Sequence, residues 1–304
     1  MFITLDIGGT KCRMAEFARL SKDQIQGVRT IPIENNWDVD FGRIVMEVES
    51  LKQERKIEGM AIGIAGALRK DKKFLTNSVN LSTWENINIK KAFADRFKSE
   101  VYLENDTFMA GFGEGYYGKV RKDFLYINWG TGVGGCLVNF KEDNSGKRKK
   151  GSVGKKNSGD KINIPLDIRA TELGHQVIVS GGIKCRCGQK GCLDAYVGGR
   201  GIQIVYGKQA VDLTQKEWKE VVERMAFGLI NALVVYPVEY LVMGGGIALN
   251  QFDKVKHMEE IINKKIKIIP PPKIRFASLD DYAGLYGCLA YLGCVCLPES
   301  FYTL

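Results

Sequence analysis

Long apolar runs are absent from this sequence, and its first residues lack the pattern of a secretory leader. A helix that spans a bilayer needs roughly 20 consecutive apolar residues, and no stretch approaches that length. Residues 1–7 read MFITLDI, without the basic region, apolar region and cleavage site of a signal peptide. These absences predict a cytoplasmic protein with no membrane partner.

A basic surface interleaved with aromatic side chains, which would stack on bases, is also missing. The net charge is +9, from 44 Lys and Arg against 35 Asp and Glu. Much of the excess lies at 141–161, KEDNSGKRKKGSVGKKNSGDK. This composition is typical of a solvated surface loop, and a contact with a polyanion is the alternative. We therefore expect no nucleic-acid partner.

Histidine is scarce, with two in the chain, and one of them lies close to three cysteines. His175 precedes Cys185, Cys187 and Cys192, which form the pattern Cys-x-Cys-Gly-x-x-Gly-Cys. Three thiolates and one imidazole favour tetrahedral zinc, and a closed shell of four protein ligands indicates a structural metal. The alternative is three reduced core cysteines beside an ordinary histidine. The other cysteines lie among apolar residues and are typical of reduced core cysteines. They are Cys12, Cys136, Cys288, Cys294 and Cys296.

The order of apolar segments predicts a duplicated α/β fold. Residues 2–17 have the pattern of a strand, a glycine turn and a returning strand, and residues 124–140 repeat it. Two halves that open in the same way imply a duplicated architecture. The 304 residues, 45% of them hydrophobic, are enough for one large or two ordinary domains.

The domain limits are expected near Gly118. We predict a small N-terminal α/β domain at 1–118, a large α/β domain with the zinc loop at 119–281, and a C-terminal helix at 282–296 that crosses back to the first domain. Apolar spacing places the remaining elements. Strands are expected at 24–33, 60–64, 101–103 and 240–243, and helices at 41–51, 89–97, 218–236 and 252–262.

Glycine turns in both halves fit phosphate groups. Without a Cβ, their backbone N–H groups are open to an anion, and Gly244–Gly246 forms a third glycine-lined wall. One such turn alone is usually structural, but two in equivalent positions predict a nucleotide site in a cleft between the halves. Asp6, at a strand end, is expected to face Mg²⁺ through water. The predicted nucleotide-site residues are Asp6, Gly8, Gly9, Thr10, Lys11, Gly130, Thr131, Gly132, Gly134, Gly244, Gly245 and Gly246.

Asp106 is the candidate chemical centre. It follows a predicted strand and begins a predicted helix, where an aspartate is commonly only an N-cap. Transfer of a phosphoryl group to a sugar hydroxyl, however, needs a carboxylate that accepts the hydroxyl proton. Both interpretations stay open from the residues alone.

The order of these motifs resembles that of the ROK (repressor, open reading frame, kinase) sugar kinases, from about residue 3 to residue 295. The motifs that carry it are DIGGT, END, GTGVGG, ELGH, the cysteine pattern and GGG. The resemblance implies an actin-like ATPase (ribonuclease H-like) fold with two domains and a cleft, use of ATP, Mg²⁺ and structural zinc, and a homodimer. It implies that Asp106 is the catalytic base and that His175 serves both zinc and sugar. The implied sugar-site residues are Gly66, Asn80, Asn105, Asp106, Glu172, His175 and Asp194.

Four departures from the family pattern bear on the choice of sugar. The loop before Glu172 reads IPLDIRAT, the basic insertion precedes it, Ala65 stands where a proline is usual before Gly66, and Asp194 replaces a usual Glu. The prediction is an ATP-dependent hexose kinase acting on the 6-hydroxyl of glucose or a relative. The alternatives are an N-acetylhexosamine kinase, such as one for N-acetylmannosamine, and a sugar-sensing repressor. The repressor is disfavoured because Asp6 leaves no room for a helix-turn-helix module, and a non-catalytic actin-like ATPase would have no use for the zinc loop.

Overall fold

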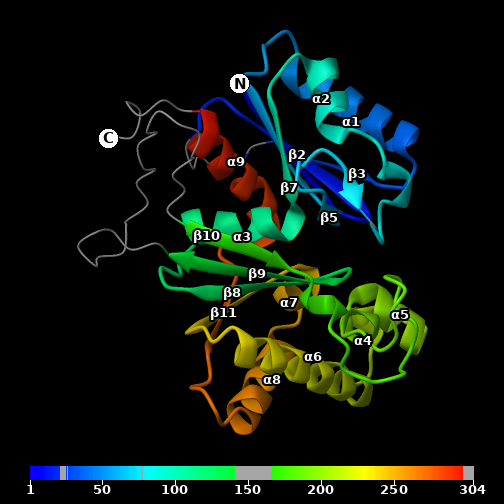
Figure 1. Cartoon of the computed structure of the whole chain (residues 1–304), viewed down its shortest axis with the longest axis vertical. Helices are drawn as coiled ribbons and strands as arrows, with labels where there is room; N and C mark the ends of the chain where they lie inside the picture. The colour runs from blue at the N-terminus through cyan, green and yellow to red at the C-terminus, as the bar shows by residue number, and fades with distance from the viewer. Residues whose placement is uncertain (21–24, 26, 77, 141–165, 297–304) are drawn as a thin grey trace. The chain divides into compact units, whose positions relative to one another are not determined.

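The computed structural model describes residues 1–20, 25, 27–76, 78–140 and 166–296, and divides the chain into two compact units (Figure 1). The first contains Met1–Lys119 and the described parts of Phe140–Ile168 and Tyr282–Leu304, and the second contains Val120–Asn139 and Arg169–Asp281. The predicted loop 141–161 lies outside the described residues. The predicted domain limits stay a prediction.

The first unit is built on a five-stranded mixed sheet. Its strand β1 pairs antiparallel with β2 and parallel with β4, and β4 pairs parallel with β7. Alternation along β1 buries Ile3, Leu5 and Ile7 in a core that also contains Ile44 and Phe93 from two covering helices. The strand order is β3 (Arg29–Pro32), β2 (Lys11–Phe17), β1 (Phe2–Ile7), β4 (Gly59–Ile64) and β7 (Val101–Asn105), and the helices are α1 (Trp37–Lys52), α2 (Ile89–Phe97), α3 (Asp106–Tyr117) and α9 (Ala283–Cys296).

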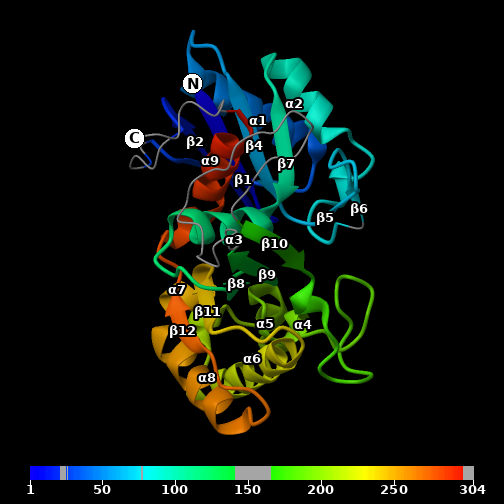
Figure 2. The same cartoon turned by 60° about the vertical axis from the view of Figure 1, so that its left-hand side comes forward.

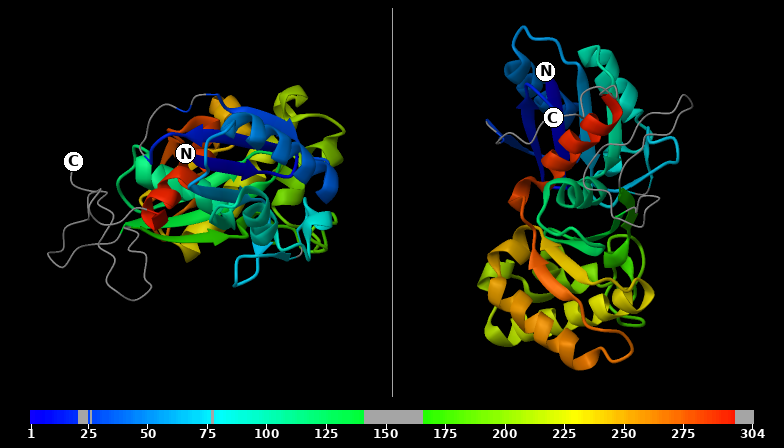
Figure 3. Two further views of the ribbon diagram at one scale, coloured as in Figure 1. Left: turned by 90° about the horizontal axis from the view of Figure 1, so that it is seen from above. Right: turned by 90° about the vertical axis from the view of Figure 1, so that its left-hand side faces the viewer.

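Helix α9 comes from the far end of the chain and packs against β1, β4 and α3 (Figures 2 and 3). Glycines make the approach to α3 possible. A Cβ on Gly287 would lie 1.7 Å from the carbonyl oxygen of Met109, and a Cβ on Gly113 would lie 2.5 Å from that of Ala283. Cys288 adds a bond from its Sγ to the carbonyl oxygen of Leu5, at 3.5 Å. The helix is therefore an integral part of the first unit.

The second unit repeats the same sheet plan, except that Phe140 and residues 166–168, at the ends of two of its strands, are assigned to the first unit. Its strand β8 pairs antiparallel with β9 and parallel with β11, as β1 does with β2 and β4. Helix α6 begins with a capping box between Thr214 and Glu217, and its apolar face, which includes Met225 and Leu229, enters the core. The strand order is β10 (Leu166–Thr171), β9 (Val133–Phe140), β8 (Phe124–Trp129), β11 (Tyr240–Gly244) and β12 (Lys273–Phe276), and the helices are α4 (Asp194–Val197), α5 (Gly199–Tyr206), α6 (Gln215–Val235), α7 (Gly246–Asn250) and α8 (Phe252–Lys265).

Short elements complete the chain. A hairpin of β5 (Ala67–Leu68) and β6 (Leu75–Thr76) follows β4. The 3₁₀ turns are η1 (Ser82–Trp84), η2 (Leu173–His175), η3 (Ala210–Asp212) and η4 (Asp280–Tyr282). Among the helices of the described residues, none combines the length and the apolar character needed to cross a bilayer.

The structure confirms the mixed α/β class and corrects several local predictions. The segment before Glu172, interpreted as a loop, forms the edge strand β10. Its residues LDIRAT alternate apolar and polar, so a strand signal was present and was overlooked. The predicted strand at 24–33 is too long: the structure has β3 at Arg29–Pro32, and the chain bends at Gly27, whose φ is +64°. Residues 24 and 26 lie outside the described residues. Strand β12 and helices α4, α5 and α7 were not predicted.

Candidate functional site

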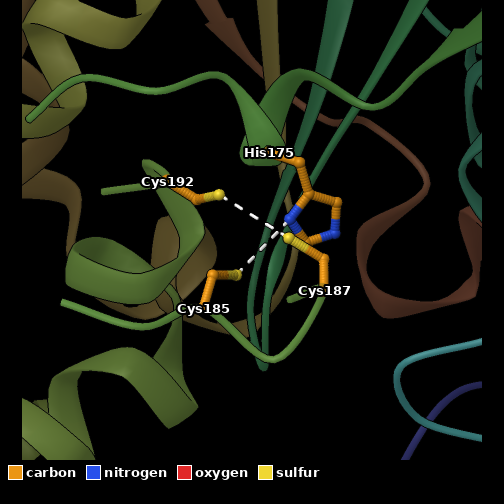
Figure 4. Close-up of side chains that lie close together, drawn as sticks. All are labelled: His175, Cys185, Cys187 and Cys192. Atoms are coloured by element: carbon orange, nitrogen blue, oxygen red, sulfur yellow. Dashed lines mark hydrogen bonds between the residues drawn. The ribbon is translucent and has the colours of Figure 1, made fainter. Parts of the chain in front are cut away.

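The structure brings the four predicted metal ligands together (Figure 4). The ligand atoms of His175, Cys185, Cys187 and Cys192 all lie within 4.8 Å of one another. His175 Nδ1 is 3.6 Å from Cys185 Sγ, and Cys187 Sγ is 3.6 Å from Cys192 Sγ. Tetrahedral zinc with ordinary Zn–N and Zn–S bonds would separate its ligand atoms by about 3.6 to 3.8 Å. The spacing and the donor types therefore fit a zinc ion.

Two glycines shape this ligand loop. Gly188 and Gly191 have φ of +95° and +81°, which other residues rarely adopt. A Cβ on Gly191 would lie 1.7 Å from the carbonyl oxygen of Val179. Burial raises the pKa of Cys192 to about 12 and also raises that of Cys185, so both thiols favour the protonated form unless a cation stabilises the thiolates.

The two carboxylates that flank the ligand loop have different surroundings. Glu172 is exposed, and its Oε2 lies 4.0 Å from Nε2 of His175, the ring nitrogen that faces away from the thiols. Asp194 is the first residue of α4, and its Oδ1 accepts a hydrogen bond from the Val133 N–H at 2.7 Å. Burial raises the pKa of Asp194, and the bond from Val133 opposes that rise. Glu172 and His175 are thus placed as a pair, whereas Asp194 is directed to the start of β9.

The second glycine turn, which we define as residues 129–133, contacts the glycine wall after β11. Gly245 has φ of +87°, and a Cβ there would lie 2.4 Å from Asn128 Oδ1 and 2.6 Å from the Trp129 carbonyl oxygen. The turn is closed by a bond from the Gly130 N–H to the Gly132 carbonyl oxygen, at 2.9 Å. The structure therefore brings Gly130–Gly132 and Gly244–Gly246 together. Gly134 lies within β9.

The first glycine turn lies between β1 and β2. The Gly8 N–H donates to the Lys11 carbonyl oxygen at 2.9 Å. Gly9 packs on Asn80, because an added Cβ would lie 2.6 Å from both Cβ and Cγ of that side chain. Asp6 Oδ2 lies 4.0 Å from Arg13 Nη1. A Cβ on Gly284 of α9 would lie 2.8 Å from the Cγ of Asp6. Thr10 and Lys11 are exposed.

A buried carboxylate joins the start of α1 to η1. Asp40 is fully buried and accepts hydrogen bonds from the Glu34 and Asn36 N–H groups and from the indole of Trp84. Every bond to this carboxylate compensates for its burial. Asn35 is also bonded to η1: the Thr83 hydroxyl donates to the Asn35 carbonyl oxygen at 2.8 Å. The start of α1 is thus tied to η1, which follows Asn80 in the chain.

Asp106 is the first residue of α3, and Asn105 fills the capping role. Asn105 Oδ1 accepts from the Phe108 N–H at 3.0 Å, while its Nδ2 donates to the Gly66 carbonyl oxygen at 3.1 Å. Gly66 has φ of +119°, which explains a glycine at this position. Asp106 Oδ1 accepts from the Thr107 N–H at 2.7 Å. The structure thus brings Gly66, Asn105 and Asp106 together at the carboxyl ends of β4 and β7.

An ion pair beside this group was not predicted from the sequence. Lys72 Nζ bonds to Oε1 of Glu104, which is 6% exposed, and Tyr291 OH lies 3.4 Å from the same oxygen. Lys72 has φ of +51° in the turn of the β5–β6 hairpin. The hairpin is therefore tied to β7 next to Asn105. A glutamate inside an otherwise apolar strand was the available signal for such a partner.

Comparison with known proteins places the chain among ROK proteins. The model of the ROK family matches residues 2–156 and 167–293. The chain is 25% identical over 284 residues to the xylose repressor of Caldicellulosiruptor bescii, covering 82% of this chain and 66% of the repressor. It is 26% identical over 312 residues to the N-acetyl-D-glucosamine kinase of Pectobacterium carotovorum, covering 94% and 97%. The chain thus spans about two thirds of the repressor's length.

Solved structures show the fold. A ROK glucokinase from Streptomyces griseus, crystallised with glucose and AMPPNP, matches with a TM-score of 0.74 and 20% identity, covering 96% of this chain and 98% of the other. The repeated five-stranded sheets and this likeness confirm the predicted actin-like ATPase fold. With the family model matched over nearly the whole chain, this protein belongs to the ROK family.

Proposed function

We propose that this ROK protein is an ATP-dependent hexose kinase that transfers the γ-phosphoryl group of ATP to the 6-hydroxyl of glucose or a closely related hexose. The observation that carries the proposal is the division of roles at the start of α3. Asn105 caps the helix, so Asp106 is not needed for that purpose. In this reaction the Asp106 carboxylate accepts the proton of the attacking hydroxyl, an O–P bond forms to the sugar, and the bond from the γ-phosphorus to ADP breaks.

The amino-acid residues that bind the sugar would come from both units. In the first, Asn105 next to Asp106 is bonded to Gly66, and Asn80 packs on Gly9. In the second, Glu172 and His175 form a pair next to the metal-ligand loop. We infer that the two units act as domains, 1–118 with 282–296 and 119–281, and close around the ligands, which would exclude water from the phosphoryl group.

Both glycine turns would hold the nucleotide. Within the described residues, no protein group accepts a hydrogen bond from the Thr131 or Gly132 N–H, so both donors are available to phosphate oxygens. Asp6, at the end of β1 with 19% of its side chain exposed, would hold Mg²⁺ through water. Bound Mg²⁺ supplies charge neutralisation of the phosphates.

Zinc would be held by His175, Cys185, Cys187 and Cys192, whose spacing fits its coordination. It supplies structural order to the loop that carries Glu172, His175 and Asp194. Coordination through Nδ1 would leave Nε2 of His175, beside Glu172, for a sugar hydroxyl.

An N-acetylhexosamine is the second candidate substrate. Asp194 is shorter than the Glu that the family usually has, and its Oδ1 is bonded to Val133. A carboxylate withdrawn in this way leaves more space at the sugar and suits a bulkier substituent. The relative from Pectobacterium carotovorum, an N-acetyl-D-glucosamine kinase, supports this candidate. We further expect a cytoplasmic homodimer without a nucleic-acid partner.

A coupled ADP-release screen tests the proposal. Purified protein with ATP and Mg²⁺ would be assayed with glucose, mannose, fructose, xylose, N-acetylglucosamine and N-acetylmannosamine, with Asp106→Asn as the matched inactive variant. We expect turnover with one or two hexoses and a large loss in the variant. Sugar-dependent thermal stabilisation without ADP release for any sugar would instead indicate a sensor and refute the kinase assignment.

A further inference from the structure

The segment that follows the metal-ligand loop is hydrogen-bonded to the second glycine turn at four points. We call residues 194–200 the tail segment. Asp194 Oδ1 accepts from the Val133 N–H at 2.7 Å, and the Val197 carbonyl oxygen accepts from the indole of Trp129 at 2.7 Å. The Gly199 N–H donates to the Gly130 carbonyl oxygen at 2.9 Å, and the Arg200 N–H donates to the Thr131 carbonyl oxygen at 3.0 Å. These bonds extend over the whole turn.

Two of these bonds determine where the turn's own N–H groups point. A peptide unit is planar and trans, so its N–H points away from its C=O. The Gly130 carbonyl shares a peptide unit with the Thr131 N–H, and the Thr131 carbonyl shares one with the Gly132 N–H. The tail segment binds both carbonyls. It therefore directs to the opposite side the two N–H groups that have no protein acceptor in the described part of the chain.

Glycines allow this close contact. A Cβ on Gly132 would lie 2.8 Å from Asp194 Oδ1, and a Cβ on Gly198 would lie 2.7 Å from the same oxygen. A larger residue at either position would crowd the oxygen that accepts from Val133. The Asp194 side chain thus occupies a space that only these two glycines leave open.

The tail segment is also continuous with the metal-ligand loop. Cys192 lies two residues before Asp194, and Leu193 between them is fully buried. A Cβ on Gly228 of α6 would lie 2.4 Å from Leu193 Cδ2, so the leucine fits closely against that helix. A displacement of Cys192 would therefore be transmitted directly to Asp194.

We propose that Asp194 is a positioning residue for nucleotide binding: through Val133 and the tail segment, it aims the Thr131 and Gly132 N–H groups at the phosphates and links their orientation to the metal-ligand loop. The proposal rests on the proposed kinase function. It assigns one oxygen of Asp194 to the nucleotide half of the site, although the family pattern places this carboxylate with the sugar.

The test compares Asp194→Ala with Asp194→Asn, since the asparagine amide retains an oxygen that can accept from Val133. Calorimetry with Mg²⁺ and AMPPNP, without sugar, should show about a 10-fold or larger loss of affinity in Asp194→Ala, the scale of a hydrogen bond to a charged group. Asp194→Asn should keep affinity within about 3-fold, because its geometry is preserved. Asp212→Ala, at an exposed aspartate of the same unit, is the control.

A proline variant tests the tail segment independently. Gly199 is the first residue of α5, where proline is tolerated, and Gly198 has φ of −66° and ψ of 150°, which suits a residue before proline. Gly199→Pro removes the donor to the Gly130 carbonyl and should weaken nucleotide binding by about 10-fold. Gln215→Pro is the matched control, because it places proline at the first position of α6, away from the turn.

Hydrogen exchange separates failure of this inference from failure of the kinase proposal. In Asp194→Ala without ligand, the Val133 amide should exchange faster, at unchanged zinc content. Unchanged exchange, or equal nucleotide affinity in wild type and Asp194→Ala, would overturn the positioning role. Equal damage in Asp194→Asn would also overturn it, because a charge effect would then explain the result. If the Val133 amide exchanges faster in Asp194→Ala but the wild type itself binds no nucleotide, the nucleotide assignment is refuted. The link between the metal-ligand loop and the turn is then retained.

Discussion

The two glycine turns lie at equivalent places in equivalent sheets but are supported differently. Each connects the central strand of its sheet to an antiparallel neighbour, in sheets of the same strand order. The first turn, at 8–10, packs on the side chain of Asn80, a predicted sugar residue. The second, at 129–133, is hydrogen-bonded to the tail segment after the metal-ligand loop. The same backbone motif is thus connected to a predicted sugar residue in one unit and to a candidate metal site in the other.

This difference shows how a duplicated fold can specialise without changing its sheet. The strands and turns repeat, while the inserted segments that contact each turn differ. Changes in either support should therefore affect nucleotide and sugar together, but by different routes.

Removal of the metal should produce the largest effect, and in the second unit only. Cys187→Ser or chelation should abolish sugar binding, because the loop that carries Glu172 and His175 loses its order. Thermal unfolding should show destabilisation of the second unit with little change in the first. Cys296→Ser, outside the ligand set, is the control. Metal analysis that finds well under one zinc per chain in the wild type would contradict this expectation.

Loss of the proposed base should have the second largest effect, and it should leave the contacts of both glycine turns unchanged. Asp106→Asn should lower kcat by at least about 100-fold, the usual scale for a general base, with sugar affinity and zinc content nearly unchanged. Steady-state kinetics with separate binding measurements check this. Near-normal turnover would reduce Asp106 to a structural residue at the helix start.

Crowding the first turn should have an intermediate effect. Gly9→Ala places a Cβ 2.6 Å from the Asn80 side chain, and overpacking of this kind costs about 1 to 3 kcal/mol. We expect a loss of about 10-fold in kcat/KM, with the KM for sugar and that for ATP both raised, because Asn80 must move. Gly42→Ala in α1, which meets nothing within 4 Å, is the control. A change confined to the KM for ATP would show that the first turn is independent of the sugar residue.

The smallest expected difference concerns one ion pair from each unit. Lys72→Met leaves the buried Glu104 carboxylate without its cation and should lower the free energy of unfolding by about 1 kcal/mol, the low end for a buried charged acceptor because Lys72 itself is half exposed. Lys122→Met breaks the pair with Glu239, in which both side chains are exposed, and should produce no measurable change. Chemical denaturation measures both, and equal effects would contradict the argument.

Parts of this molecule with a local sequence signature could be predicted. The short apolar segment at residues 2–7, followed by a glycine turn, predicted β1, and the cysteine spacing predicted ligands that the structure does bring together. Asp106 was placed correctly at a helix start, but the sequence could not show that Asn105 takes the capping role.

The remainder depends on contacts that leave no local pattern. Strand β10 is an exception, because the alternation in its residues LDIRAT was a local signal that the sequence interpretation overlooked. The bonds from Gly199 and Arg200 to the second turn use backbone atoms that every residue has. The pair between Lys72 and Glu104 joins residues 32 positions apart through the packing of a hairpin. Only tertiary structure reveals such interactions.

The position of α9 has a consequence for the order of synthesis. This helix covers β1 and β4 and interlocks with α3 through Gly113 and Gly287, yet it is made after the whole of the second unit. All residues of the second unit are therefore synthesised while the apolar surface that α9 covers in the first unit is still open. For the nascent chain, the first unit to be started is the last to be finished.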